Sequence, residues 1–158
     1  MKLYADTSVL IAWFNPADEF APAVTRWCRS RSAEFCWNPF LRAEVRHNLR
    51  KVTGRYGALA WQAYRACEAA GLLKLDRARP GDLLDAADQL STQCAAKTTA
   101  GTWDCVHVAA AQHAGVSVFA TCDSAQAELA RLARIPQVRL LKSNARGPRD
   151  KENQGAPF

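Results

Sequence analysis

The sequence predicts an α/β fold in which a central, mostly parallel sheet lies between layers of helices. Short apolar runs of strand length alternate along the chain with longer segments in which apolar residues recur every three or four positions. This alternation is typical of strand–helix–strand units, whose strands run parallel. The chain has 158 residues, of which 49% are hydrophobic, enough for one core but too few for two ordinary domains.

We therefore expect one domain over residues 1–142, followed by a flexible tail at 143–158 that is rich in glycine, proline and charge. Strands are predicted at 3–5, 34–38, 72–75, 116–120 and 138–141. Helices are predicted after Asp6, at 21–31, 39–52, 58–70 and 82–96, over 102–114, and after Asp123. Pro39 suits a first helical turn, and Gly71 and Gly115 are expected to end their helices.

Several polar and small residues mark the expected ends of helices. Taken alone, Asp6 is expected to cap the first helix, but Asp6 is also a candidate site residue. Thr7 or Ser8 is then expected to be the cap, because a hydroxyl can accept a hydrogen bond from the free backbone N–H groups there. Thr102 is expected to cap the helix over 102–114 for the same reason. Gly54 and Gly57 are expected to form the turn before the helix at 58–70.

The composition indicates the kind of partner and the cell compartment to expect. Lys and Arg number 21 against 15 Asp and Glu, giving a net charge of +6 and a pI near 9.2, which favours a polyanionic partner. The first residues lack the apolar core of a signal peptide, and no apolar run is long enough to span a bilayer. We expect a cytoplasmic protein that is not membrane-bound. The six cysteines show no paired spacing, which favours buried, reduced thiols over disulfides or zinc.

Four acidic residues are candidates for one site. Asp6 and Asp123 directly follow strands, and the carboxyl ends of parallel strands meet at the edge where ligands bind. Glu44 and Asp104 lie in helices that can face the same crevice. Carboxylates that converge repel one another and raise one another's pKa values unless a divalent cation neutralises them. Oxygen ligands alone favour Mg²⁺ or Mn²⁺ over zinc.

These acids lie in segments that together resemble a known family. The segments Asp6–Ile11, Leu41–Val45, Trp103–Ala111 and Thr121–Asp123, in this order, resemble the PIN-domain family. The sequence is most similar to the VapC-like ribonuclease toxins of bacterial type II toxin–antitoxin modules. The resemblance covers nearly the whole chain before the tail, and it implies a PIN-like three-layer αβα fold.

The resemblance also implies a function: a Mg²⁺- or Mn²⁺-dependent endoribonuclease that leaves a 5′ phosphate and a 3′ hydroxyl. The residues that would hold the metal are Asp6, Glu44, Asp104 and Asp123. Thr7 and Ser8 would lie beside the first acid as auxiliary hydroxyls, available to a metal-bound water or a phosphate oxygen. The implied partners are an RNA substrate, a small cognate antitoxin and a second copy of the chain in a homodimer.

Further residues are candidates for contact with RNA. Arg42, Arg46 and Arg50 recur every four positions, so they form a positive row that is either a solvated face or an RNA contact. His107 follows Asp104 by three residues and shares its helix face, where a structural, hydrogen-bonded histidine is favoured over one that touches substrate. Three tryptophans are expected to pack in the core rather than to stack on bases: Trp13, Trp37 and Trp103.

Two other functions fit part of the sequence. A catalytically silent PIN-like module would bind RNA or a protein partner without cleaving RNA. A phosphotransferase of the haloacid dehalogenase type also places Asp-Thr-Ser after a strand. That chemistry needs a second Asp two residues after the nucleophile, and Ser8 occupies this position. The ribonuclease therefore remains the leading hypothesis.

Overall fold

The computed structural model describes residues 1–30, 33–52 and 55–143. Within these ranges, five strands form one sheet in the order β3-β2-β1-β4-β5, and every pair of neighbours is parallel. The strands are β1 (Lys2–Ala5), β2 (Glu34–Trp37), β3 (Leu73–Leu75), β4 (Val118–Thr121) and β5 (Gln137–Leu140). The predicted α/β class with a parallel sheet is confirmed. The predicted tail lies outside the described residues from position 144 onward.

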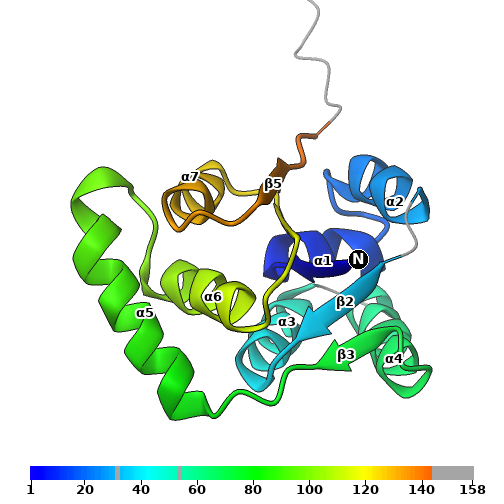
Figure 1. Ribbon diagram of the computed structural model, residues 1–158. Coiled ribbons are helices and arrows are strands. Elements are labelled where there is room, and N and C mark those ends of the chain that lie inside the picture. Colours follow the sequence, from blue (N-terminus) through cyan, green and yellow to red (C-terminus); the bar gives the residue numbers. More distant parts are fainter. Residues whose placement is uncertain (31–32, 53–54, 144–158) are drawn as a thin grey trace, which may run out of the picture.

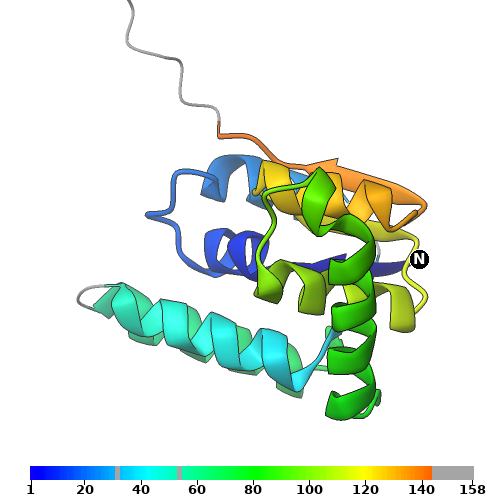
Figure 2. The ribbon, with the colours of Figure 1, turned by 90° about the vertical axis from the view of Figure 1, so that its left-hand side faces the viewer.

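Helices connect the strands and pack in two groups (Figure 1, Figure 2). They are α1 (Thr7–Phe14), α2 (Ala21–Arg29), α3 (Pro39–Lys51), α4 (Arg55–Ala69), α5 (Pro80–Cys94), the short 3₁₀ helix η1 (Ala95–Lys97), α6 (Thr102–His113) and α7 (Ser124–Leu132). Helix α1 contacts α2, α3 and α4, whereas α6 contacts α5 and α7. Most predicted boundaries agree within two residues. Helix α4 begins three residues before the predicted start.

The sheet topology fixes where a site can form. The chain places β2 and β3 on one side of β1 and then places β4 and β5 on the other side. The order of the strands therefore changes direction at β1, and in open parallel sheets ligands bind beyond the carboxyl ends of the strands at such a point. Tyr4 of β1 lies opposite Cys36 of β2 and Phe119 of β4. The carboxyl ends of β1 and β4 thus open on the same edge.

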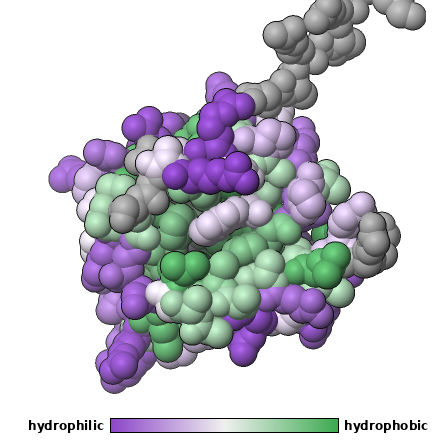
Figure 3. All heavy atoms as spheres, turned by 90° about the vertical axis from the view of Figure 1, so that its right-hand side faces the viewer, coloured by the Kyte–Doolittle hydropathy of each residue, from purple (hydrophilic) through white to green (hydrophobic). Residues whose placement is uncertain are grey.

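The core forms around the two central strands. Leu3, Tyr4, Val118 and Phe119 are each no more than 1% exposed, and the rings of Tyr4 and Phe119 stack with centroids 5.7 Å apart. Such near-continuous burial is expected of parallel strands that helices cover on both faces. On the side of the molecule where α2 and α4 lie, apolar side chains also spread across the middle of the surface, with polar ones around them (Figure 3).

The cap of α1 differs from the prediction. Thr7 and Ser8 already belong to the helix, and Asp6 is the N-cap. Its Oδ1 accepts a hydrogen bond from the backbone N–H of Val9 at 3.0 Å. The residue directly before the first helical residue is placed to accept this bond, whereas the hydroxyls of Thr7 and Ser8 already lie inside the helix. Asp6 therefore caps α1 and also lies at the sheet edge.

The predicted cap of α6 is also wrong. Thr102 is the first helical residue, and Gly101 is the N-cap. Gly101 has no side chain to accept a bond, and the helix start is instead stabilised from inside, since the Oδ2 atom of Asp104 accepts the backbone N–H of Gly101 at 2.7 Å. Gly71 and Gly115 follow α4 and α6 with φ of 69° and 62°, which confirms that they end these helices.

Gly57 was expected in a turn but lies in α4. A Cβ atom at this position would clash with the backbone oxygen of Leu49 and would lie 2.9 Å from that of Val52. The absence of a side chain therefore lets the first turn of α4 approach the end of α3. Gly54, the other glycine of the predicted turn, is outside the described residues.

The cysteines, one tryptophan and the hydropathy of the helices bear on three further predictions. The six cysteines are reduced thiols, as predicted. Four are buried (Cys28, Cys36, Cys94 and Cys105) and two are partly buried (Cys67 and Cys122). Trp103 is 52% exposed, so its predicted core position is wrong, and the reason is that it lies in the first turn of α6 next to an exposed loop. None of the described helices combines the length and the hydropathy that crossing a membrane requires.

Candidate active site

A cleft of about 270 Å³ lies at the carboxyl edge of β1 and β4. The predicted acids and hydroxyls line it together with His107: Asp6, Glu44, Asp104, Asp123, Thr7 and Ser8. Asp6 and Asp123 come from the ends of β1 and β4, whereas Glu44 and Asp104 come from α3 and α6. The first turns of α1, α6 and α7 contribute residues, so the positive ends of these helix dipoles lie near the cleft.

Asp6 forms the buried floor of the cleft. Only 4% of its surface is exposed, and its carboxylate accepts hydrogen bonds from Ser8 Oγ at 2.7 Å, from the backbone of Val9 at 3.0 Å and from Thr121 Oγ1 at 2.8 Å. Burial raises the pKa of Asp6 from 3.8 to about 6, although these bonds oppose the rise. The hydrogen bonds therefore fix the orientation of the carboxylate, while its burial disfavours the ionised form.

Ser8 and Thr7 use their hydroxyl hydrogens inside the protein. Ser8 donates to Asp6 and accepts the backbone N–H of Cys122 at 2.9 Å. Thr7 Oγ1 donates to Glu44 Oε2 in a short hydrogen bond. Both side chains therefore orient carboxylates in this structure. Their predicted contact with a phosphate or a metal-bound water stays a prediction.

Glu44 is held by a chain of hydrogen bonds that starts on β1 and at the start of α3. Asn38 caps α3 with its Oδ1, which leaves its amide nitrogen to donate to the Tyr4 hydroxyl at 3.1 Å. Tyr4 and His107 Nδ1 lie 2.9 Å apart, and His107 Nε2 lies 2.5 Å from Glu44 Oε2. Because Tyr4 accepts from Asn38, its own hydrogen is directed to Nδ1. His107 is then protonated on Nε2 and donates to Glu44.

This chain explains the charge state of Glu44. Burial alone would raise the pKa of Glu44, but the hydrogen bonds that its carboxylate accepts from His107 and Thr7 bring the pKa below its ordinary value. His107 is 1% exposed. It acts as the hydrogen-bonded structural histidine that the sequence favoured, and its second role, contact with RNA, stays a prediction.

Asp104 and Asp123 are joined by a residue that the sequence reasoning missed. Gln126 is 2% exposed; its side-chain nitrogen donates to Asp104 Oδ1 at 3.0 Å, and its backbone N–H donates to Asp123 Oδ1 at 3.1 Å. Its Oε1 atom is buried without a hydrogen-bond partner. A signal was present, because Asp-x-x-Gln at a helix start is a capping-box pattern. Burial raises the pKa of Asp104, and repulsion from Asp123 and Glu44 adds to the rise.

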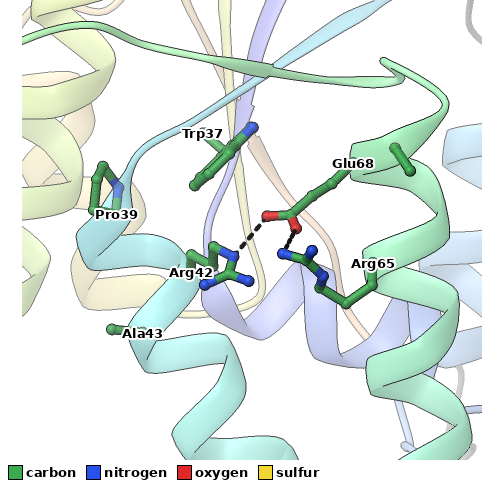
Figure 4. A pocket seen from close by; sticks show the side chains of 7 residues that line it. Trp37, Pro39, Arg42, Ala43, Arg65 and Glu68 are labelled. Atoms are coloured by element: carbon green, nitrogen blue, oxygen red, sulfur yellow. Dashed lines mark hydrogen bonds and ion pairs between the residues drawn. The ribbon is translucent and has the colours of Figure 1, made fainter.

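The predicted arginine row does not line the cleft. Arg42 and Arg46 are two positions away from Glu44 on either side, so they lie on the opposite face of α3, toward α4. Arg42 bonds to Glu68 at 2.9 Å, and Arg65 bonds to the other oxygen of Glu68 at 2.7 Å (Figure 4).

The rest of the row also faces away from the acids. The guanidinium of Arg46 lies 4.4 Å from the ring centroid of Trp61. Arg50 is exposed and lines a separate hollow with Arg46. Contact with RNA would therefore occur outside the acidic cleft, and it stays a prediction.

The fit of a metal can be judged from these contacts. Among residues 1–30, 33–52 and 55–143, no three His, Cys, Asp or Glu side chains converge closely enough to form a ligand set. Glu44 Oε2 accepts hydrogen bonds from Thr7 and His107. The donor chemistry nevertheless fits a hard divalent cation, since all four groups are carboxylates. Such a cation would also relieve the repulsion that raises the pKa of Asp104.

Comparison with solved structures supports the same fold. The chain is similar to the Mycobacterium tuberculosis toxin VapC20, described as cleaving the sarcin-ricin loop, with 16% identity and a TM-score of 0.65 over 80% of this chain and 93% of that chain. It is similar to FitAcB from Neisseria gonorrhoeae, with 16% identity and a TM-score of 0.58 over 87% and 96% of the two chains.

A third similar structure is VapBC2 from Rickettsia felis bound to a DNA fragment from its promoter. Its chain is 12% identical, with a TM-score of 0.62 over 91% of this chain and all of that chain. No curated protein sequence matched significantly. The model of the PIN domain family matches residues 3–132, which include all four predicted acids. The chain therefore belongs to the PIN domain family.

Proposed function

We propose that the protein is a Mg²⁺- or Mn²⁺-dependent endoribonuclease that acts as the toxin of a toxin–antitoxin pair in the cytoplasm. The observation that carries the proposal is the cleft at the change of strand order, which Asp6, Glu44, Asp104 and Asp123 line together. Proteins of the PIN family generally use divalent metals. The net charge of +6, with these acids gathered in one cleft, suits a substrate with a phosphate backbone.

In this proposal, Asp6, Glu44, Asp104 and Asp123 hold the cation. The bound cation supplies Lewis acidity, which neutralises charge on the phosphodiester and acidifies a water molecule. The protein's own residues prepare the site. Hydrogen bonds from Ser8 and Thr121 orient the Asp6 carboxylate. Gln126 donates hydrogen bonds to both Asp104 and Asp123 and so connects the two acids.

His107 holds Glu44 in its ionised form, because a carboxylate that accepts a hydrogen bond from an imidazole is harder to protonate. Glu44 is therefore available as an anionic ligand or as a hydrogen-bond acceptor that orients an attacking water. The positive ends of α1, α6 and α7 near the cleft favour the approach of a phosphate.

The direct test is cleavage of total RNA by the purified protein with Mg²⁺, with Mn²⁺ and with EDTA. We expect cleavage that requires the metal and is lost in Asp6→Asn and Asp104→Asn. Asp85→Asn is the matched control, because Asp85 is an exposed acid of α5 outside the cleft, and it is expected to cleave like the wild type. Cleavage that persists in both cleft variants would refute the assignment. Metal-independent RNA binding without cleavage would instead favour the silent PIN-like module.

The partners belong to the same proposal. We expect a small antitoxin encoded next to this gene, and a homodimer of the chain. The apolar surface on the side of α2 and α4 is a suitable contact area, since contiguous exposed apolar surface generally marks an interaction site (Figure 3). Co-expression with the neighbouring gene followed by co-purification tests the first expectation, and light scattering of the purified chain tests the second. Separate elution of the two proteins, or a monomeric mass, would refute them individually.

A further inference from the structure

An exposed tryptophan adjoins one of the cleft acids in the sequence. Trp103 directly precedes Asp104 in the first turn of α6, and 52% of its surface is exposed. The other exposed aromatic side chain among the described residues is Tyr56 on α4, a helix that does not line the cleft. Exposure of a single large apolar residue is ordinary in itself. What distinguishes Trp103 is its place next to a cleft acid.

A second aromatic residue faces Trp103 across the two helices. Phe40 lies in the first turn of α3, and its ring centroid is 6.0 Å from that of Trp103, with the planes inclined at 57°. Phe40 also packs against the core, which anchors it. Because the two rings are tilted rather than stacked, they do not lie face to face.

Helix geometry relates this pair to the proposed reaction centre. Phe40 precedes Glu44 by four residues, and Trp103 precedes His107 by four residues, so each aromatic lies one turn before a cleft residue on the same helix face. Glu44 and His107 contact each other at 2.5 Å. The aromatic pair is therefore the next layer of contacts between α3 and α6, about 6 Å along the helices.

We propose that Trp103, supported by Phe40, is a stacking platform for an unpaired base of single-stranded RNA next to the bond to be cleaved. The inference rests on the proposed ribonuclease function and specifies its substrate: a strand whose base is not already stacked in a duplex. Aromatic side chains bind bases of any sequence in this way, because every base presents a flat face. The platform supplies affinity for unpaired RNA, which the acids alone do not provide.

The test measures RNA binding by fluorescence anisotropy in the Asp6→Asn background, with Mn²⁺ present. The probes are a labelled single-stranded RNA and the same sequence as a duplex. Trp103→Ala is expected to weaken binding of the single strand by roughly tenfold while leaving binding of the duplex nearly unchanged. Trp103→Phe, which keeps an aromatic face, is expected to restore most of the affinity.

Leu59→Ala is the matched control, because Leu59 is also 52% exposed but lies on α4. It is expected to bind both probes as the parent does. Three results would overturn the platform: unchanged single-strand binding in Trp103→Ala, an equal loss for both probes, or a change in oligomeric mass, which would assign Trp103 to contact with a second copy.

Failure of the platform is distinguishable from failure of the proposed function. If the wild type cleaves RNA and Trp103→Ala binds and cleaves as the wild type does, the platform alone is refuted. If the wild type neither cleaves nor binds RNA, the ribonuclease function is refuted, and the platform with it.

Discussion

Asp6→Asn removes one negative charge from the buried floor of the cleft while keeping the size of the side chain. In the metal-free protein, the Asp6 carboxylate is 4% exposed and its pKa is raised from 3.8 to about 6, chiefly by burial. Asn is able to keep the bond from Val9 through its carbonyl oxygen, and its amide is able to donate to Thr121. The main change is therefore the loss of the buried charge, and the Thr121 hydroxyl also loses its carboxylate acceptor.

The magnitude follows from the difference between the two pKa values, which corresponds to about 3 kcal/mol. Because the folded pKa of Asp6 lies above the unfolded one, the folded state prefers the protonated acid. The corresponding stability is fully present below pH 3.8 and is lost as the pH rises through about 6. Above that pH, the buried charge of Asp6 lowers the free energy of unfolding of the wild type, whereas the Asn variant has no such charge.

Thermal unfolding in EDTA at a series of pH values measures this difference. Near pH 8, the Tm of Asp6→Asn is expected to exceed that of the wild type by roughly 6–12 °C, and near pH 4 the two should nearly coincide. Asp85→Asn serves as the control, since removal of an exposed charge on α5 should leave Tm almost unchanged at both pH values. A Tm difference that is independent of pH, or a less stable variant near pH 8, would refute the reasoning.

The same experiment with Mn²⁺ connects stability to metal binding. A ligand that binds only the folded protein raises its stability. We expect Mn²⁺ to raise the Tm of the wild type near pH 8 and to raise that of Asp6→Asn much less, because the variant lacks one proposed ligand. Equal increases in the two proteins would exclude Asp6 as a ligand.

Three further substitutions test the packing around the site and the helix ends. Tyr4→Phe removes the hydroxyl that pairs with the Asn38 amide and with His107 Nδ1. Urea unfolding should show a free energy of unfolding lower by about 1–3 kcal/mol, and an unchanged value would contradict the hydrogen-bond chain. Gly57→Ala places a Cβ atom against the end of α3, including the oxygen of Val52, and should cost about 1–3 kcal/mol, whereas Gly81→Ala, with nothing within 4 Å, should be neutral in the same urea assay. Arg134 follows α7 with a φ of 59°, so Arg134→Gly should raise Tm by about 1–4 °C in calorimetry, and a lower Tm would show that its side chain stabilises the fold.

Much of the site could be predicted from the sequence because it depends on local patterns and on one rule of topology. Asp6 and Asp123 directly follow apolar strands, and parallel strands bring their carboxyl ends to one edge. Helical spacing then places Glu44 and Asp104 within reach of that edge. The structure brings these four acids into one cleft, and their role as metal ligands stays a proposal.

What only the tertiary structure decided depends on contacts between distant segments. No local pattern links Asn38 through Tyr4 to His107, because the three residues come from separate elements that the sheet brings together. Burial likewise cannot be deduced from residue type alone: Trp103 is exposed because α6 begins at the surface, although tryptophan usually packs inside. The sequence by itself thus determined which acids could meet. The packing of α3 and α6 against the sheet determined how Glu44 is held and that Trp103 lies against Phe40.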